Sequence, residues 1–490
     1  MTTHEDQPPG QGIDWIDRSA CAYLILPVFL FCAWFVTPVA VALLALSVFG
    51  TWYTLRNGRS PSRQRLSVGL LCAISIVALG WTAISGGGHF FYANADWVMR
   101  DGVLHDLATG NWPPIYETPD SRTLILRAPI GYFLPAAAIG QVAGTGMADI
   151  ALYAWTAIGL GLVLAAACSL FESRAQRIAC VVVILMFGGM DLLGLILFQG
   201  HLPPMGEHIE WWMPYFQYSS NTTLLFWAPN HALPAWLGIL LVLRHWRSPE
   251  LARITPLLAT AVSLWSPLAA IGLFPFFLLG LAWRRDLRTL FSPRTCLVFI
   301  PVAGVLAAYL GMESASVKHG WMLTRFSSPI DFAYCYALFC LLEFGILALV
   351  LARIAPLDLP VRIAIVVLCL LPMVLYGPGN DLAMRGSIPA LTVLALATVR
   401  PLVQSQRSAW HIMLTLILAI GMLGAFQEPF RAMTRKAWQI KGQTLPEAVA
   451  WIAPDSPDFF PAHYFAPVNS SGVQRFMRKP VQAAQPEQGR

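Results

Sequence analysis

Residues 86–135 read GGGHFFYANADWVMRDGVLHDLATGNWPPIYETPDSRTLILRAPIGYFLP and form the one long polar stretch in a chain otherwise built from apolar runs. Acidic and large aromatic residues gather here: Asp96, Asp101, Asp106, Glu117 and Asp120, with Trp97, Trp112 and Tyr116. An apolar run that predicts a helix lies on either side. We therefore expect a polar loop held between hydrophobic helices, and we expect any chemistry to be in it.

The composition excludes a soluble protein. Of the 490 residues 57% are apolar and only 12% are charged, and the mean hydropathy is +0.60. Repeated apolar runs between short arginine-bearing loops are what helices need to cross a bilayer core of about 30 Å. The net charge of +6 comes mostly from these loops, which is a signal of membrane topology and not of nucleic-acid binding. The nine cysteines show no spacing typical of a zinc site.

The expected fold is an all-α polytopic membrane protein with about thirteen transmembrane helices. Two pairs, within 20–55 and 254–283, are split at Thr37-Pro38 and Ser266-Pro267, so each is a hairpin or one long kinked helix. The thirteen runs are 20–36, 38–55, 66–84, 149–170, 178–198, 224–244, 254–267, 268–283, 295–311, 331–352, 361–377, 386–400 and 409–425.

The basic residues predict the orientation. The short loops on one side of these spans hold seventeen arginines, against six basic residues in the much longer loops on the other side. By the positive-inside rule the N-terminus is cytoplasmic and the C-terminus extracytoplasmic. The apolar run 131–146 contains Pro135 and four glycines, so we place it as an interfacial or re-entrant helix. Residues 85–148 are then one extracytoplasmic loop.

Three parts follow from this arrangement. Residues 1–65 form a cytoplasmic segment and a two-helix hairpin whose first helix is retained as a membrane span, because the N-terminus lacks a basic region and a cleavage site. Residues 66–425 form the main transmembrane unit. Residues 426–490 form a short extracytoplasmic tail. It begins with a basic stretch and ends in a proline-rich part, and we expect this proline-rich part to be poorly ordered.

Asp96 is the first candidate catalytic residue. A helix over 94–108, with Asn94 as its N-cap, would lie at the membrane surface and put Asp96 in the first turn, where the helix dipole favours a carboxylate. Such a carboxylate can act as a general base for an acceptor hydroxyl. Asp106, on a different face, could orient that base, hold an acceptor or bind a metal. The alternative is that Asp96 caps the helix and Asp106 faces water.

A second group of residues suits a sugar. Aromatic rings stack on the C–H faces of sugars, while amide and imidazole groups bind the hydroxyls. Asn230 and His231 lie in a proline-broken apolar run, where they need a polar cavity. An aromatic belt at the membrane interface is the alternative for the tryptophans and tyrosines, but it does not account for Asn230 and His231. The candidate sugar or acceptor residues are Trp97, Gln217, Tyr218, Trp227, Asn230, His231, Asn380 and Asp381.

Candidate phosphate ligands come from the outer loops. Arg385 follows Gly377-Pro378-Gly379-Asn380-Asp381 at the predicted start of a helix, where a cation and backbone N–H groups together bind phosphate. Its alternative is snorkelling to lipid headgroups. Arg127 and Lys318 are further candidates. Asp191 and Glu343 lie inside apolar runs with no evident partners, which favours a structural or interfacial place over a relay.

The order of these features resembles the GT-C superfamily of membrane glycosyltransferases, which includes protein O-mannosyltransferases and lipid A aminoarabinose transferases. The resemblance rests on loose, short matches over roughly residues 66–425: Asn94-Ala95-Asp96-Trp97, Leu126-Arg127-Ala128-Pro129-Ile130-Gly131-Tyr132-Phe133-Leu134-Pro135 and Asn380-Asp381-Leu382-Ala383-Met384-Arg385. In that family the first large outer loop carries the general base, and Asp96 matches its position. Two extra helices before this loop and the small tail depart from the family pattern.

The resemblance implies inverting transfer of a sugar from a polyprenyl phosphate to a glycan, lipid or protein acceptor. Asp96 would be the base, Arg385 with Arg127 or Lys318 would bind the donor phosphate, and Trp227, Asn230 and His231 would contact the sugar. The resemblance leaves the use of a divalent metal undecided, because the paired acids of metal-dependent relatives are not adjacent here. The implied setting is cell-envelope polysaccharide synthesis at the extracytoplasmic face of a bacterial inner membrane.

Two other functions fit part of the pattern. A transporter or flippase of a lipid-linked saccharide would also have broken helices and an aromatic cavity, although internal repeats and coupled membrane acids are expected of it. A non-catalytic subunit of glycan assembly would use the outer loops only for binding. Asp96→Asn distinguishes them, because only the enzyme should lose turnover.

Overall fold

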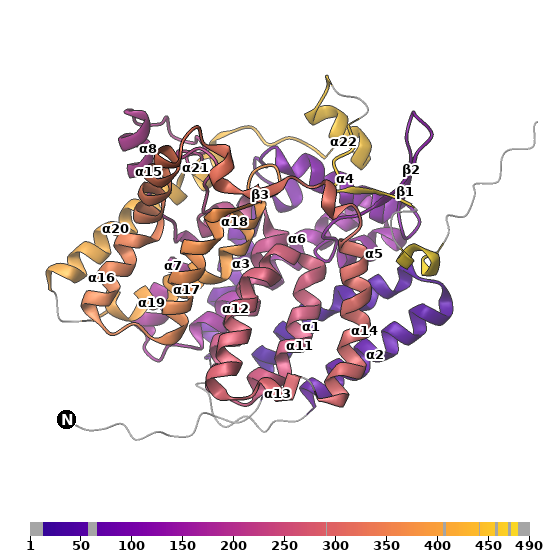
Figure 1. Ribbon diagram of the computed structural model, residues 1–490, viewed down its shortest axis with the longest axis horizontal. Helices are drawn as coiled ribbons and strands as arrows, with labels where there is room; N and C mark the ends of the chain where they lie inside the picture. Colours follow the sequence, from indigo (N-terminus) through magenta and orange to yellow (C-terminus); the bar gives the residue numbers. More distant parts are fainter. Residues whose placement is uncertain are drawn as a thin grey trace, which may run out of the picture.

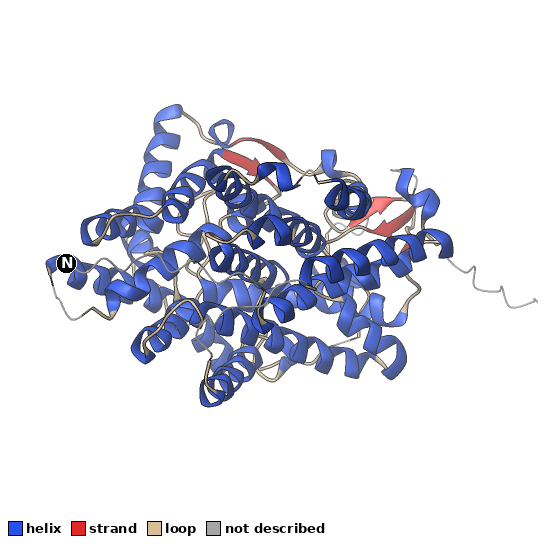
Figure 2. Cartoon of the chain, turned by 90° about the horizontal axis from the view of Figure 1, so that it is seen from below, coloured by secondary structure: helices blue, strands red, loops and turns tan. Residues whose placement is uncertain are grey.

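The computed structural model describes residues 13–56, 66–290, 292–404, 408–440, 442–455, 459–468 and 472–478. It is mostly helical, with two small sheets (Figures 1 and 2). The helices up to residue 245 are α1 (Trp15–Phe31), α2 (Thr37–Leu55), α3 (Val68–Ile84), α4 (Asp96–Thr109), α5 (Leu134–Ala143), α6 (Thr145–Cys168), α7 (Arg174–Met186), α8 (Asp191–Gln199), α9 (Asn221–Trp227) and α10 (Pro229–His245).

The second half of the chain is also mostly helical. Its helices are α11 (Glu250–Trp265), α12 (Pro267–Arg284), α13 (Leu287–Leu290), α14 (Pro293–Leu310), α15 (Pro329–Cys340), a π-helical turn (Leu341–Gly345), α16 (Ile346–Ile354), α17 (Leu359–Leu370), α18 (Asp381–Gly386), α19 (Ile388–Leu402), α20 (Ala409–Ala425), α21 (Gln427–Thr434) and α22 (Leu445–Ile452).

A helix occupies each of the thirteen predicted runs, which confirms a helical, membrane-type architecture. Within the described residues, seven helices are long and apolar enough to cross a bilayer, or eight if the bent pair α7 and α8 is one span. Thirteen crossings therefore stay a prediction. The two proline-split pairs are each two helices: α1 packs against α2, and α11 packs against α12 after a break at Ser266.

The start of α1 is tied to the end of α10 by buried ion pairs. Arg244 bonds Asp17 at 2.6 Å and Asp14 at 2.5 Å, and His245 lies 3.0 Å from Asp17. Buried charges of this kind are stable only when paired. The first described residues and the α10–α11 loop therefore lie on the same face of the molecule, as the predicted cytoplasmic side requires.

The long loop is a compact layer on the opposite face. α4 and α5 pack on each other and on α6, and α5, with ten residues, is too short to span. Between them, β1 (Ile115–Glu117) and β2 (Thr123–Leu126) form a hairpin. A second sheet joins β3 (His319–Trp321), in the predicted outer loop 312–330, to β4 (Val374–Tyr376). β4 lies at the end of the predicted span 361–377, where the structure has a strand in place of helix.

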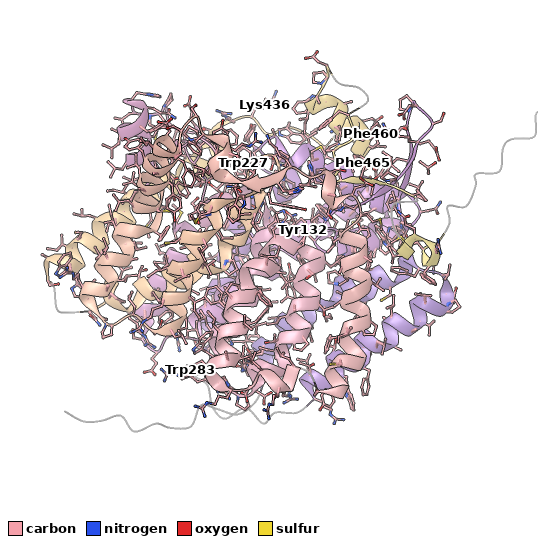
Figure 3. The ribbon with its side chains drawn as sticks, in the orientation of Figure 1. Tyr132, Trp227, Trp283, Lys436, Phe460 and Phe465 are labelled. Carbon is pink, nitrogen blue, oxygen red and sulfur yellow. The ribbon has the colours of Figure 1, made fainter. Side chains whose placement is uncertain are left out.

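The tail is structured where it is described, which corrects the expectation of a poorly ordered end for residues 442–455, 459–468 and 472–478. α22 packs on α4, and β5 (Phe465–Pro467) pairs with β2 to give the sheet order β1-β2-β5. Figure 3 shows Lys436, Phe460 and Phe465 at one face and Trp283 near the other. The apolar side chains of the tail therefore cover the outer loop.

Candidate functional site

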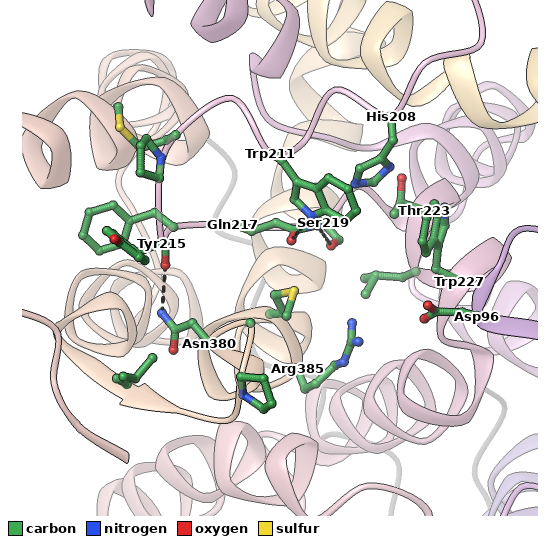
Figure 4. Close-up of a pocket in the computed structure, with 18 of the residues that line it drawn as sticks. Asp96, His208, Trp211, Tyr215, Gln217, Ser219, Thr223, Trp227, Asn380 and Arg385 are labelled. Carbon is green, nitrogen blue, oxygen red and sulfur yellow. Dashed lines mark hydrogen bonds between the residues drawn. The ribbon is translucent and has the colours of Figure 1, made fainter. Parts of the chain in front are cut away.

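Two cavities meet under the loop face. The smaller cavity has a volume of about 480 Å³ and the larger about 900 Å³. Five residues line both of them: Asp96, Leu375, Pro378, Gly379 and Arg385. Asp96 and Arg385, two of the residues singled out from the sequence, are thus the charged groups at the junction. Figure 4 shows both side chains at the smaller cavity, Asp96 from α4 and Arg385 from α18.

The start of α4 is fixed by bonds to the end of α9. Asn94 donates to the carbonyl of Phe226 at 2.7 Å and accepts from the backbone N–H of Asp96 at 3.1 Å. Trp97 donates to the same carbonyl at 2.9 Å and is buried. The helix starts at Asp96 with Ala95 as its cap residue, so Asn94 lies one residue before the cap. These bonds leave the Asp96 side chain 45% exposed, with Arg100 as its partner at 3.4 Å.

Arg385 lies in the six-residue helix α18. α18 and α19 together form one candidate span, Asp381–Leu402, so Arg385 is near the start of a long helix, as predicted. Its Nε is buried and has no hydrogen-bond partner in the described chain. The turn before α18 needs unusual backbone: Asn380 has a φ of 59°, and at Gly377, with a φ of 88°, a Cβ would lie 1.9 Å from an Asp381 carboxylate oxygen. A half-buried guanidinium that lines a cavity and has a free N–H is suited to an anionic ligand.

Aromatic and polar side chains line the smaller cavity together. Trp211 is 63% exposed, donates to the side-chain oxygen of Gln217 at 2.9 Å and has its ring 6.1 Å from that of Trp227. Asn380 donates to the carbonyl of Tyr215 at 3.3 Å, which joins two predicted outer loops at the cavity wall. Such walls offer stacking faces and hydrogen bonds, as a saccharide requires. The further polar lining residues are His208, Ser219, Thr223, Lys318 and Arg325.

His208 was not singled out from the sequence. It lies 2.9 Å from Glu428 in α21, and Glu428 also accepts from Trp227 at 2.9 Å and pairs with Arg431. Burial lowers the pKa of His208, but its hydrogen bond to Glu428 and the charges of Glu210 and Glu428 outweigh burial, so the pKa is raised. The signal in the sequence is weak, because its partners come from a segment more than 200 residues away.

The larger cavity is mostly apolar, with polar groups near the junction. His231 forms a 2.7 Å hydrogen bond with Ser266, while the Asn230 side-chain oxygen is buried without a partner in the described chain. The apolar walls come from the long loop 85–148, from α12, α14 and β3 and from the tail, and include Met99, Val103, Phe133, Leu268, Ile271, Leu310, Trp321, Val449 and Ile452. An elongated apolar ligand with a polar end fits this combination.

The predicted site residues fall into three groups: those that line the smaller cavity, those that line the larger cavity and those that line neither. Gln217, Trp227, Lys318 and Asn380 line the smaller cavity, and Arg127, Asn230, His231 and Asp381 line the larger one. Trp97, Asp106 and Tyr218 line neither. Tyr218 is buried and donates to the carbonyl of Leu368 at 2.6 Å.

Asp106 is a structural residue here. It accepts from Tyr116 at 2.8 Å and from the backbone N–H of Leu445 at 3.0 Å. Burial raises its pKa above the ordinary value, against the effect of these two bonds. Asp106 therefore anchors α22 on α4. It is not placed to orient Asp96 as a base, and its side chain does not face water.

Asp191 and Glu343 are not isolated, which corrects the sequence interpretation. Their side chains interact at the break between α7 and α8, beside the π-helical turn. Both are buried, and Glu343 accepts from Trp212 at 3.0 Å. Neither forms an ion pair with a basic residue in the described part of the chain. Paired carboxyl groups at a broken membrane helix are a feature of ion-coupled transporters.

No group of three or more His, Cys, Asp or Glu side chains suited to a metal ion occurs among the described residues. Comparison of the chain with protein-family models, with curated proteins and with solved structures gives no match. The GT-C resemblance therefore stays a prediction from the sequence motifs.

Proposed function

We propose that this protein is an inverting membrane glycosyltransferase that uses a polyprenyl-phosphate sugar and acts at the extracytoplasmic face. One observation carries the proposal: an apolar cavity and an aromatic, polar cavity meet at Asp96 and Arg385. A lipid-linked donor needs the first kind of cavity, and a hydroxyl-bearing acceptor, whether glycan, lipid or protein, needs the second.

The reaction follows from the junction. Asp96 takes the proton of the acceptor hydroxyl, whose oxygen forms a bond to the anomeric carbon as the bond from that carbon to the phosphate oxygen breaks. The lipid phosphate leaves with the electron pair. Arg385 stabilises the negative charge that develops on it, and it does so most strongly where water is excluded. Attack from the face opposite the phosphate inverts the anomeric centre.

The first test is transfer of radiolabelled sugar from polyprenyl-phosphate donors by purified protein in nanodiscs. Asp96→Asn should reduce transfer by about 10²–10⁴-fold, the usual contribution of a general base, and should keep donor binding. Asp120→Asn is the matched control, since Asp120 is exposed in the β1–β2 turn and outside both cavities. Equal turnover in wild type and Asp96→Asn would exclude Asp96 as the base.

A lipid-linked saccharide transporter is the second candidate, favoured by the Asp191 and Glu343 pair. In that case the wild type binds donor and turns over none, and labelled lipid-linked sugar crosses the bilayer of proteoliposomes. Asp191→Asn and Glu343→Gln should then stop the crossing, while Asp96→Asn should not. Sugar transfer by the wild type, lost in Asp96→Asn, would decide for the enzyme.

A further inference from the structure

The C-terminal tail forms part of the larger cavity. Side chains of α22 and of the segment before β5 line its wall: Val449, Ile452, Phe459, Pro461, His463 and Tyr464. Most of these are apolar, but His463 is not. A residue near the end of the chain thus reaches the same cavity as Arg385 and Asp96, in a segment that sequence reasoning left without a role.

The backbone around His463 is fixed by Arg127. The Arg127 backbone N–H donates to the carbonyl of Tyr464 at 2.7 Å, and its guanidinium donates to the carbonyl of Ala462 at 3.4 Å. One residue therefore bonds the chain on both sides of His463. The pairing of β5 with β2 continues this attachment, since Phe465 is opposite Leu126.

Arg127 is consequently less available to a ligand than predicted. Its other terminal nitrogen donates to the carbonyl of Leu310, which leaves only Nε without a partner in the described chain. A guanidinium engaged with two carbonyls from separate segments holds those segments together. The phosphate-binding role expected of Arg127 is therefore left to its Nε and to other donors in the cavity.

The His463 side chain is free to bind a ligand, whereas that of Arg127 is held by two carbonyls. Its imidazole makes no hydrogen bond or ion pair within the described residues, and it is exposed at the cavity wall. Although the residue is open to the cavity, the protein atoms packed around the imidazole remove water from it, and this desolvation lowers its pKa below 6.5; nearby Asp381 opposes the effect and Arg127 adds to it. A neutral imidazole at pH 7 has one N–H to donate.

We propose that His463 binds the phosphate of the lipid donor in the larger cavity, and that Arg127 is the positioning residue that holds it there. The inference rests on the proposed function, because it assigns the larger cavity to the donor. It adds the tail to the donor site: a chain without residues 459–468 would keep Asp96 and Arg385 but would lose this phosphate contact.

The test compares binding of undecaprenyl phosphate and of undecaprenol to the full-length protein in nanodiscs, by native mass spectrometry. His463→Ala should weaken binding of the phosphate lipid about tenfold, as expected for loss of one charge-assisted hydrogen bond. It should leave undecaprenol binding unchanged. His463→Gln, which keeps an N–H donor, should recover most of the affinity. His201→Ala is the control, since His201 is exposed and outside both cavities.

Each outcome is informative. Wild-type protein that prefers the phosphate lipid, with His463→Ala unchanged, overturns the role of His463 and leaves the proposed function standing. Equal weakening for both lipids in His463→Ala means that the residue shapes the cavity, which also overturns the role. Wild-type protein with no preference for the phosphate lipid removes the donor assignment, and with it the basis of the inference.

Discussion

His208 connects the loop before α9 to the helix that follows the last predicted span. Its pKa is raised, so the protonated form stabilises the fold. This contribution is fully present below the unfolded-state pKa of about 6.5 and is lost as the pH rises through the raised folded-state pKa. We predict that His208→Ala lowers the free energy of unfolding by about 1.5–3 kcal/mol at pH 6, as for a buried hydrogen bond to a charged group.

The measurement is thermal unfolding of wild type and variant between pH 6 and pH 9. The difference in melting temperature should shrink as the pH rises. His201→Ala, whose ring is exposed and bonds only the carbonyl of Gln199 among the described residues, should show no such trend. A constant difference at every pH would mean that His208 acts only by packing.

Residue type and loop position were enough to single out Asp96 and Arg385, since few charges occur in so apolar a chain. The same reasoning failed for Asp106, because the tail that buries it is more than 330 residues away. It also missed His208 and His463. A histidine in a polar loop has no periodicity or spacing that shows whether its partner is water, Glu428 or a cavity.

At the scale of elements, the break between α7 and α8 depends on Gly189. A Cβ there would lie 2.0 Å from Oε2 of Glu343 and 3.2 Å from its Cα. We predict that Gly189→Ala destabilises the protein by about 1–3 kcal/mol through overpacking. Glu343→Ala in the same chain should restore part of the loss, because it removes the closer of the two contacts. Thermal unfolding in detergent measures both.

Gly80→Ala is the control, since a Cβ at Gly80 in α3 meets nothing within 4 Å. It should leave stability unchanged or raise it slightly, as alanine favours a helix more than glycine does. If the double variant lost as much stability as the sum of the two single variants, the contact between Gly189 and Glu343 would not be the cause.

The helices themselves were predictable, because each apolar run is long and bounded by arginine, proline or glycine. Their pairing was not. Asp191 and Glu343 are 152 positions apart, and only the packing of α8 beside the π-helical turn brings them together. β5 could not be predicted either, because the three residues that pair with β2 are too few to show the alternation of a strand.

At the scale of the whole molecule, the candidate site and the arginine-rich segments lie at opposite ends. The helices of the long loop and α22 of the tail lie at one face, and α13 lies at the other (Figure 1). Residues of the long loop and of the tail line the larger cavity, and Arg284 and Arg288 lie in α12 and α13. The ion pairs of Asp14 and Asp17 with Arg244 put the start of α1 at the arginine end. This arrangement matches what the positive-inside rule requires of a site outside the cytoplasm.

The orientation can be tested with two fusion points that differ by one helix. We predict that green fluorescent protein fused after Gln404 is fluorescent and that alkaline phosphatase fused after Arg490 is active, because α20 lies between them and is apolar enough to span. A fluorescent fusion after Arg56, at the end of α2, is the control for the cytoplasmic side. The opposite result at both points would turn the two cavities toward the cytoplasm and exclude an extracytoplasmic reaction. The same side for both points would mean that α20 does not cross, which would separate the tail and its His463 from the face assigned to the donor.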